Sequence, residues 1–315
     1  MLSQVTDPVT VYEVSPRDGL QNETQVLSVA DKRALVEALV AAGLRHVEVT
    51  SFVSPRWVPQ LADAGELIRS LPAAPGVIFS ALCPNTTGLE RARLAGLKEA
   101  AIFLSASESH NQRNTNKSIQ RSLEAFEELI PMARDAGMRV RAYISTVWGC
   151  PYEGTVDPRR ALWIARELLH WGAYQVSLGD TIGVGTPLQT QDICRLFLGE
   201  FAADQLALHF HDTRGTALSN VLVGLDLGIR TFDAAVAGLG GCPYAPGAAG
   251  NLASEDLVYM LHGMGIETGI DLEALIHAGQ VAERLLGRAL PGKVHQAGLP
   301  RIRLDGAVAG TGMLR

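Results

Sequence analysis

The sequence lacks the features of a membrane protein, a disulfide-rich secreted scaffold and a nucleic-acid-binding protein. It contains no apolar run of about 18 residues, the length that a membrane-spanning helix requires. Its four cysteines are scattered and form no CxxC pair, so neither a disulfide framework nor a zinc ribbon is indicated. The formal net charge of −6 and the pI near 5.8 argue against a basic surface for nucleic acid.

The two ends of the chain lack targeting signals. Residues 1–9 have neither the apolar stretch of a signal peptide nor the arginines of a transit peptide. The last four residues, 312–315, match no retention or prenylation signal. We therefore expect a cytoplasmic protein with no membrane partner and no nucleic-acid partner.

What the sequence does contain is a regular alternation of short β-rich runs and longer helical patterns. Hydrophobic residues make up 47% of the 315 residues, enough for a large core. Eight strands recur at a spacing of about thirty residues, which is typical of βα units that close into a TIM (β/α)8 barrel. The predicted strands are Val9–Val14, His46–Thr50, Val77–Leu82, Ala100–Leu104, Arg139–Ser145, Ala173–Leu178, Leu206–Phe210 and Thr231–Val236.

Two further helices, at Glu255–His262 and Leu272–Leu286, are expected after the eighth strand. The fold class is therefore α/β, a TIM (β/α)8 barrel with additional C-terminal helices. We assign residues 1–289 to this barrel and residues 290–315 to a Gly-rich C-terminal appendage or tail. An open doubly wound sheet would carry a Gly-rich phosphate turn after its first strand, and this chain has 15–19 (SPRDG) there instead.

Polar residues follow nearly every predicted strand, where the active site of such a barrel lies. His209 and His211 are two residues apart on one strand, so both side chains face the same side. Asp18 after the first strand and Asn251 after the eighth could add oxygen ligands. Mixed imidazole and oxygen ligands suit Mg²⁺ or Mn²⁺ better than a structural zinc. The alternative is a pair of core histidines, each satisfied by hydrogen bonds.

Other strand-end residues have two interpretations each. Arg17 could stabilise developing negative charge, or could form an ordinary surface ion pair with Asp18. Glu48 could orient a ligand, or could belong to a strand-end ion pair. Asp180 could bind substrate or cap a turn. Cys242 lies in a glycine-rich loop and could transfer a proton over a closed site, or fill a small apolar space.

Long motifs at these positions resemble the hydroxymethylglutaryl-CoA lyase family of metal-dependent TIM-barrel enzymes. The resemblance covers about residues 9–286, and its most specific strings are RDGLQNE at 17–23 and GLGGCPYAPGAAGN at 238–251. Further matching strings are TSFVSPRWVPQ at 50–60, GCPYEG at 149–154 and SLGDTIGVGT at 177–186.

The resemblance implies cleavage of (S)-3-hydroxy-3-methylglutaryl-CoA to acetyl-CoA and acetoacetate, and leucine degradation and branched-terpenoid breakdown are both compatible pathways. It implies that the acyl-CoA thioester is the partner and that a divalent cation is the cofactor. By position it implies the metal ligands and catalytic residues, to which we add a set of expected substrate-binding residues. We also expect a homo-oligomer, a dimer or a tetramer. The metal ligands are Asp18, His209, His211 and Asn251; the catalytic residues are Arg17, Asp18, Glu48, His209 and Cys242; the substrate-binding residues are Arg17, Gln21, Ser177 and Asp180.

The sequence departs from the family pattern in one segment, which is expected to lie near the acyl group of the substrate. Residues 108–114 (ESHNQRN) form a more polar run than expected near the barrel mouth, so a longer or branched 3-hydroxy-3-alkylglutaryl-CoA is an open alternative. Two other functions also stay open: a related aldolase or acyl-CoA synthase acting on a 2-oxo acid, and a non-catalytic metal- or acyl-CoA-binding barrel.

Overall fold

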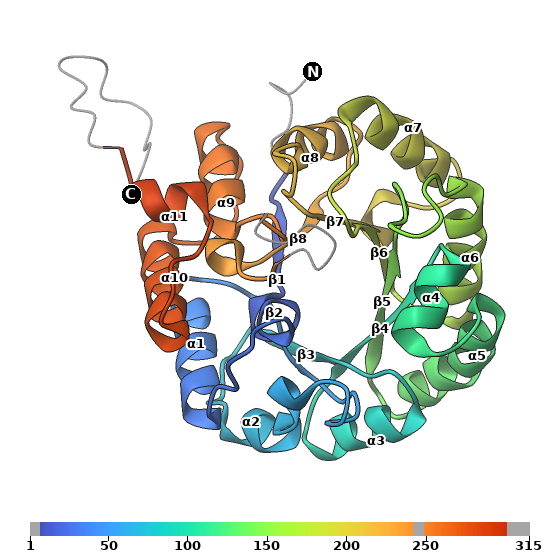
Figure 1. Cartoon of the computed structure of the whole chain (residues 1–315), viewed down its shortest axis with the longest axis horizontal. Helices are drawn as coiled ribbons and strands as arrows, with labels where there is room; N and C mark the ends of the chain where they lie inside the picture. The colour runs from blue at the N-terminus through green and yellow to red at the C-terminus, as the bar shows by residue number, and fades with distance from the viewer. Residues whose placement is uncertain (1–6, 242–248, 301–315) are drawn as a thin grey trace.

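The chain folds into a closed barrel of eight parallel strands surrounded by helices (Figure 1). The computed structural model describes residues 7–241 and 249–300. Strand β1 pairs with β8 from Thr10↔Thr231 to Glu13↔Ala234, and this pairing closes the barrel. The expected (β/α)8 fold is confirmed. The strands are β1 Thr10–Glu13, β2 His46–Ser51, β3 Ile78–Leu82, β4 Glu99–Ser105, β5 Arg139–Ser145, β6 Gln175–Asp180, β7 Leu206–Phe210 and β8 Thr231–Ala234.

The helices form where an apolar stripe meets good end signals. Helix α6 starts after Asp157, whose carboxylate accepts from the Arg159 N–H, and ends at Gly172, whose φ is +112°. Its apolar face packs inward. The principal helices are α1 Val29–Ala41, α2 Ala64–Ser70, α3 Thr86–Leu94, α4 Glu108–Thr115, α5 Ile119–Asp135, α6 Pro158–Trp171, α7 Pro187–Leu198, α8 Ala217–Asp226, α9 Ser254–Gly263, α10 Leu272–Leu286 and α11 Lys293–Ala297.

Two of these elements were not expected. Helix α4 occupies the polar run after β4 and starts at Ser107, whose hydroxyl accepts from the His110 N–H at 3.2 Å. Helix α11 lies in the segment predicted to be an appendage or a tail, and it packs against α9 and α10. Residues 301–315 of that segment lie outside the described residues. Neither helix has the apolar periodicity by which helices are recognised in a sequence.

The interior of the barrel contains a buried ion pair rather than only apolar layers. Arg141 on β5 donates to Asp233 on β8 at 2.6 Å, and both side chains are 0% exposed. Gln175 accepts from the Arg141 Nε at 2.9 Å, and the guanidinium lies 4.1 Å from the Tyr12 ring centroid and 4.9 Å from that of Tyr143. Burial alone would raise the pKa of Asp233, but the Arg141 guanidinium lowers it by more than burial raises it. The pKa therefore lies below its usual value, and the carboxylate is ionised.

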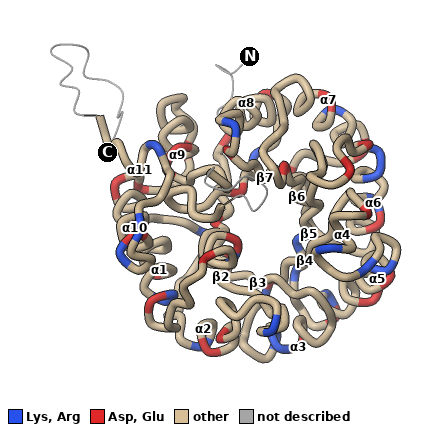
Figure 2. The backbone as a smooth tube through the Cα atoms, in the orientation of Figure 1, with Lys and Arg blue, Asp and Glu red and all other residues tan. Residues whose placement is uncertain are grey.

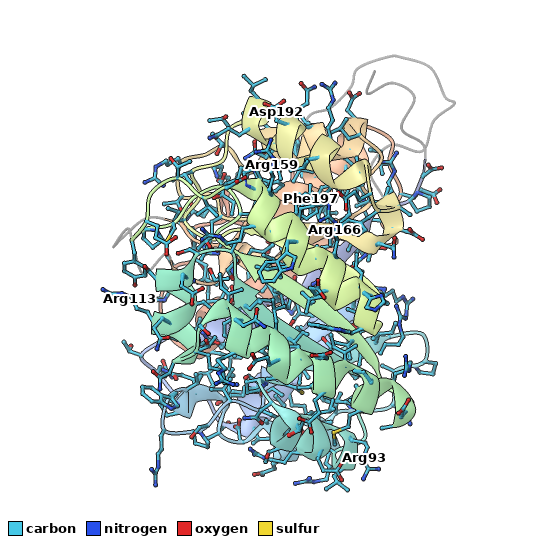
Figure 3. All side chains as sticks on the ribbon, turned by 90° about the vertical axis from the view of Figure 1, so that its right-hand side faces the viewer. Arg93, Arg113, Arg159, Arg166, Asp192 and Phe197 are labelled. Carbon is cyan, nitrogen blue, oxygen red and sulfur yellow. The ribbon has the colours of Figure 1, made fainter. Side chains whose placement is uncertain are left out.

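The outer surface carries charges of both signs. Blue and red segments are interspersed around the ring of helices (Figure 2), and Arg93, Arg159 and Arg166 lie on this outer layer in the side view (Figure 3). No helix within residues 7–241 and 249–300 is long and apolar enough to cross a membrane.

Replacing Arg141 with methionine should destabilise the fold, because Asp233 would keep a buried charge without its partner. Breaking a buried pair in this way costs about 3–5 kcal/mol of unfolding free energy. Urea denaturation of the metal-free protein measures the loss. Arg93→Met, which removes an exposed partner of Glu90, is the control and should leave the urea midpoint unchanged. Equal midpoints for both variants would contradict the importance of the interior pair.

Candidate metal centre and active site

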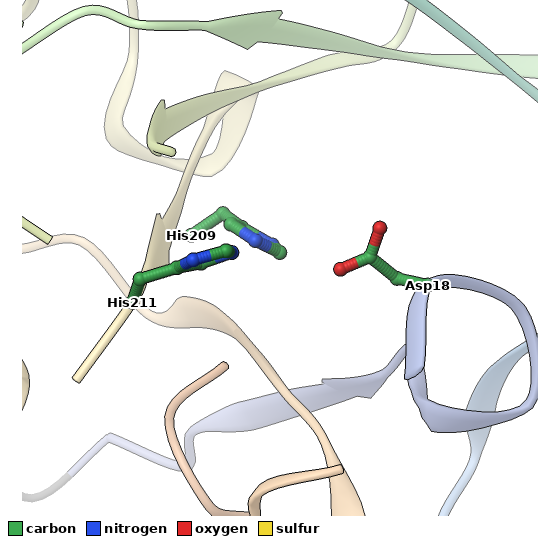
Figure 4. Close-up of side chains that lie close together, drawn as sticks. All are labelled: Asp18, His209 and His211. Atoms are coloured by element: carbon green, nitrogen blue, oxygen red, sulfur yellow. The ribbon is translucent and has the colours of Figure 1, made fainter. Parts of the chain in front are cut away.

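Asp18, His209 and His211 converge at one point on the barrel mouth. Each offers one ligand atom, and these atoms all lie within 4.8 Å of one another. In Figure 4 the two imidazoles lie side by side and face the Asp18 carboxylate across the site. The three residues come from the exits of β1 and β7, which are far apart in the sequence. Their convergence is what the expected metal site required.

Local backbone geometry explains how each group reaches this point. Residues Ser15–Gly19 form one π-helical turn directly after β1, in which the Asp18 N–H donates to the Val14 carbonyl at 2.7 Å. The turn directs Asp18 inward instead of along the strand. His209 lies on β7 and His211 one residue past its end, so the period of two keeps both on the inner face.

Asn251 completes the group. Its backbone pairs with that of His211 in an antiparallel bridge, which holds the loop after β8 against the exit of β7. Its Nδ2 donates to Asp18 Oδ2 at 2.9 Å and to the Leu239 carbonyl at 3.1 Å, while its Oδ1 is buried without a hydrogen-bond partner. A buried carbonyl oxygen without a donor is costly, and a cation would satisfy it.

The protonation states suit a cation. Burial alone would raise the pKa of Asp18, but Arg17 and the two histidines lower it to about 2, so the carboxylate is ionised at neutral pH. Burial lowers the pKa of His211 to about 4, which keeps that imidazole neutral. The Nδ1 atoms of His209 and His211 are buried without a hydrogen-bond partner. His211 therefore does not fit the alternative of two fully satisfied core histidines, whereas the Asp233 carboxylate lies 3.3 Å from His209 Nδ1.

A chain of buried hydrogen bonds holds Asp18 in place. Tyr143 and Arg17 both donate to the fully buried carboxylate of Glu48, and Arg17 Nη1 donates to Asp18 Oδ1 at 2.5 Å. Burial alone would lower the pKa of Arg17, but Glu48 and Asp18 raise it, so the guanidinium keeps its charge. Arg17 is 7% exposed, which excludes the surface ion pair considered above. Its Nη2 makes no hydrogen bond to any described residue, and a substrate oxygen could accept from it.

A second carboxylate, Asp233, lies behind His209. The two residues are paired across β7 and β8, and His209 Nδ1 lies 3.3 Å from Asp233 Oδ2, a contact distance without good hydrogen-bond alignment. A carboxylate at this position fixes the orientation of a metal-binding imidazole. Asp233 was not among the predicted site residues, although its inward position on β8 between Phe232 and Ala234 was a signal that could have identified it.

The predicted substrate-binding residues occupy different settings. Gln21 is half-buried just beyond the π-helical turn. Ser177 is fully buried and donates to Asp233 at 2.7 Å. Asp180 accepts from the Val184 N–H at 3.0 Å and from the Gly185 N–H at 2.8 Å, the turn-capping arrangement considered above. Substrate binding by these three residues stays a prediction.

Comparison with known proteins identifies the family. The HMGL-like family model matches residues 8–282. The chain belongs to the HMGL-like family. It is 53% identical to the 3-hydroxy-3-isohexenylglutaryl-CoA/hydroxy-methylglutaryl-CoA lyase of Pseudomonas aeruginosa, over 89% of this chain and 94% of that one.

Solved structures of the HMGL-like fold agree. The HMG-CoA lyase of Bacillus subtilis has a TM-score of 0.92 and 45% identity, and the match covers 93% of this chain and 98% of that one. An HMG-CoA lyase from Acinetobacter baumannii, solved with coenzyme A and 3-methylmalate, has a TM-score of 0.90 and 38% identity over 96% and 98% of the two chains.

Cys242 of this HMGL-like chain lies outside the described residues, so its role stays a prediction. The base of its loop is described: Gly241 and Ala249 form an antiparallel bridge. Gly240 has a φ of +110°, and a Cβ there would lie 2.7 Å from Asn251 Nδ2. Only glycine fits at this position without displacing the amide that contacts Asp18.

Removing one of the imidazoles should weaken metal binding in this HMGL-like protein. We expect His211→Ala to lower Mn²⁺ affinity by about 100-fold or more, since an inner ligand outweighs the 10–100-fold effect of outer partners. Isothermal titration measures the dissociation constant. His277→Ala, at an exposed position on α10, is the control and should bind as the unmodified protein does. Equal Mn²⁺ affinity in both variants would show that His211 is not a metal ligand.

Proposed function

We propose that this protein is a divalent-metal-dependent carbon–carbon lyase. Its substrate would be (S)-3-hydroxy-3-methylglutaryl-CoA, or a close 3-hydroxy-3-alkylglutaryl-CoA, and its products acetyl-CoA and acetoacetate or the matching 3-oxo acid. The observation that carries the proposal is the convergence of Asp18, His209 and His211 beside the unpartnered carbonyl of Asn251. The lyase names of the relatives support the choice of substrate.

The donor set supports Mg²⁺ or Mn²⁺ as the cation. Asp18, Asn251, His209 and His211 would hold it, and oxygen with imidazole ligands suits these ions. When bound, the cation would lower the pKa of the substrate's tertiary hydroxyl and neutralise charge on its oxygens. Cytoplasmic location, a homo-oligomeric state and a role in leucine degradation stay predictions.

Cleavage begins with removal of the proton from the tertiary hydroxyl. Asp18 and His209 are the candidate bases. A carboxylate with a pKa of about 2 takes a proton poorly near neutral pH, which supports His209. Each imidazole presents one nitrogen to the site, so His209 can bind the cation or take the proton, but not both at once.

The remaining steps use Arg17 and Cys242. The alkoxide becomes the carbonyl of acetoacetate as the adjacent carbon–carbon bond breaks, and the electron pair passes to the thioester enolate of acetyl-CoA. Arg17, kept cationic by Glu48, would donate from Nη2 to the oxygens that carry this charge. Cys242 would return a proton to the enolate carbon when its loop closes, directly or through a relay.

Arg17→Gln should lower kcat by about 10²–10³-fold, because it removes a fixed charge-stabilising donor. An acetoacetate assay with HMG-CoA and Mg²⁺ measures the rate, and Mn²⁺ titration checks that the site still binds metal. Arg33→Gln, which removes an exposed arginine of α1, should retain normal turnover. The proposal fails if the unmodified protein with Mg²⁺ releases no acetoacetate from HMG-CoA or its 3-alkyl analogues.

Replacing His209 with alanine distinguishes its two possible roles, proton acceptor and metal ligand. If it takes the proton, His209→Ala should lower kcat by about 10²–10⁴-fold while Mn²⁺ affinity changes little. If it holds the cation, affinity should fall together with turnover, as for His211→Ala. Near-normal turnover in His209→Ala would exclude both roles.

A further inference from the structure

Helix α11 packs beside two segments that bring the metal-site residues together: the exit of β7 and the turn at which the loop after β8 leaves the barrel. It lies outside the residues matched by the family model, yet it packs against α9, α10 and the turn Val236–Gly238, and Figure 1 shows it beside α9 and α10. Leu290 just before it is 1% exposed, and His295 within it is 8% exposed. A helix so placed can influence the segments on which it packs.

Lys293 at the start of α11 reaches the exit of β7. Its Nζ lies 2.5 Å from Asp212 Oδ2 and 3.8 Å from Asp256 Oδ2. Asp212 directly follows the metal-site residue His211, and its N–H donates to the Gly250 carbonyl at 2.7 Å, next to Asn251. The Lys293 ammonium group therefore binds beside the point at which the segment carrying His211 meets the segment carrying Asn251.

His295 reaches the other end of the same loop. It lies 3.8 Å from Glu255 and 3.2 Å from Glu283. Glu255 accepts from the Ala237 N–H at 2.7 Å, and the Ala237 carbonyl accepts from the Gly292 N–H at 2.8 Å. Ala237 has a φ of +52°, a strained conformation for a residue with a Cβ.

The contacts of Ala237 matter because the loop that carries Asn251 leaves the barrel there. Hydrogen bonds from both sides, to Glu255 and from Gly292, keep the strained turn in place. Gly279 on α10 makes room for the arrangement, since a Cβ there would lie 2.5 Å from the His295 ring and 2.8 Å from Glu255. Glu255, Glu283 and Gly279 thus lie against the His295 ring, and the contact with Glu255 is one of packing and charge without a hydrogen bond.

We propose that α11 positions the metal ligands, with Lys293 and His295 as the positioning residues. Lys293 fixes the β7 exit against the start of α9, and His295 fixes the turn from which the Asn251 loop departs. Together they set the spacing between His211 and Asn251. The proposal rests on the metal site of the proposed function.

The test is Mn²⁺ affinity, measured by the electron paramagnetic resonance signal of free Mn²⁺ and compared with the melting temperature of the metal-free protein. Lys293→Met should weaken Mn²⁺ binding by about 10-fold, the lower end of the effect of outer-shell changes. The metal-free melting temperature should barely change, because the Lys293 side chain is 66% exposed and exposed ion pairs add little stability. Lys293→Arg should restore most of the affinity.

His295→Leu is the second variant, and Lys98→Met, at an exposed position before β4, is the control with unchanged affinity. Unchanged Mn²⁺ affinity in both Lys293→Met and His295→Leu would overturn the proposal. A loss of affinity that only follows a loss of metal-free stability would also overturn it. Failure of the unmodified protein to bind Mn²⁺ would instead overturn the metal site itself, and with it the proposed function.

Discussion

The buried ion pair between Arg17 and Glu48 is the constraint on which the site depends. Glu48 is fully buried within β2, and among the residues that the structure describes Arg17 and Tyr143 supply the hydrogen bonds to its carboxylate. Because an uncompensated buried charge is costly, Arg17 must stay turned into the barrel. The next residue, Asp18, is thereby carried to the mouth and faces the histidines. Fold and site are thus linked by one charge pair.

The residues of the metal site are held in place by two different parts of the structure. Asp18 and His209 are backed by the barrel interior, through Glu48 in one case and through Asp233 and Arg141 in the other. Asn251 is held by its backbone bridge to His211, by the Leu239 carbonyl and by the helices packed behind it. The first set is held by the barrel wall itself. The second depends on segments outside that wall, which meet β7 through the backbone bridge between His211 and Asn251.

Much of the site was predictable because barrel topology converts sequence positions into spatial ones. Strand ends must meet at one mouth, so His209, His211 and Asp18 could be assigned to one site before the structure was known. Asp233 was missed because its one signal was an inward position within an apolar strand, without a motif, and because its role depends on which strand lies beside it. Helices α4 and α11 were missed because their polar or short sequences lack the spacing of an apolar face. The ion-pair partners of Lys293 could not be predicted either, because Asp212 and Asp256 lie far from it in the sequence.

The most direct test of this account is pulsed electron paramagnetic resonance of the Mn²⁺-loaded protein. The account predicts modulation from imidazole nitrogen coordinated to the ion, which is lost in the double variant His209→Ala/His211→Ala. A Mn²⁺ complex of the unmodified protein that shows no nitrogen coupling would contradict the central claim that the cation is held between Asp18 and the imidazoles of β7.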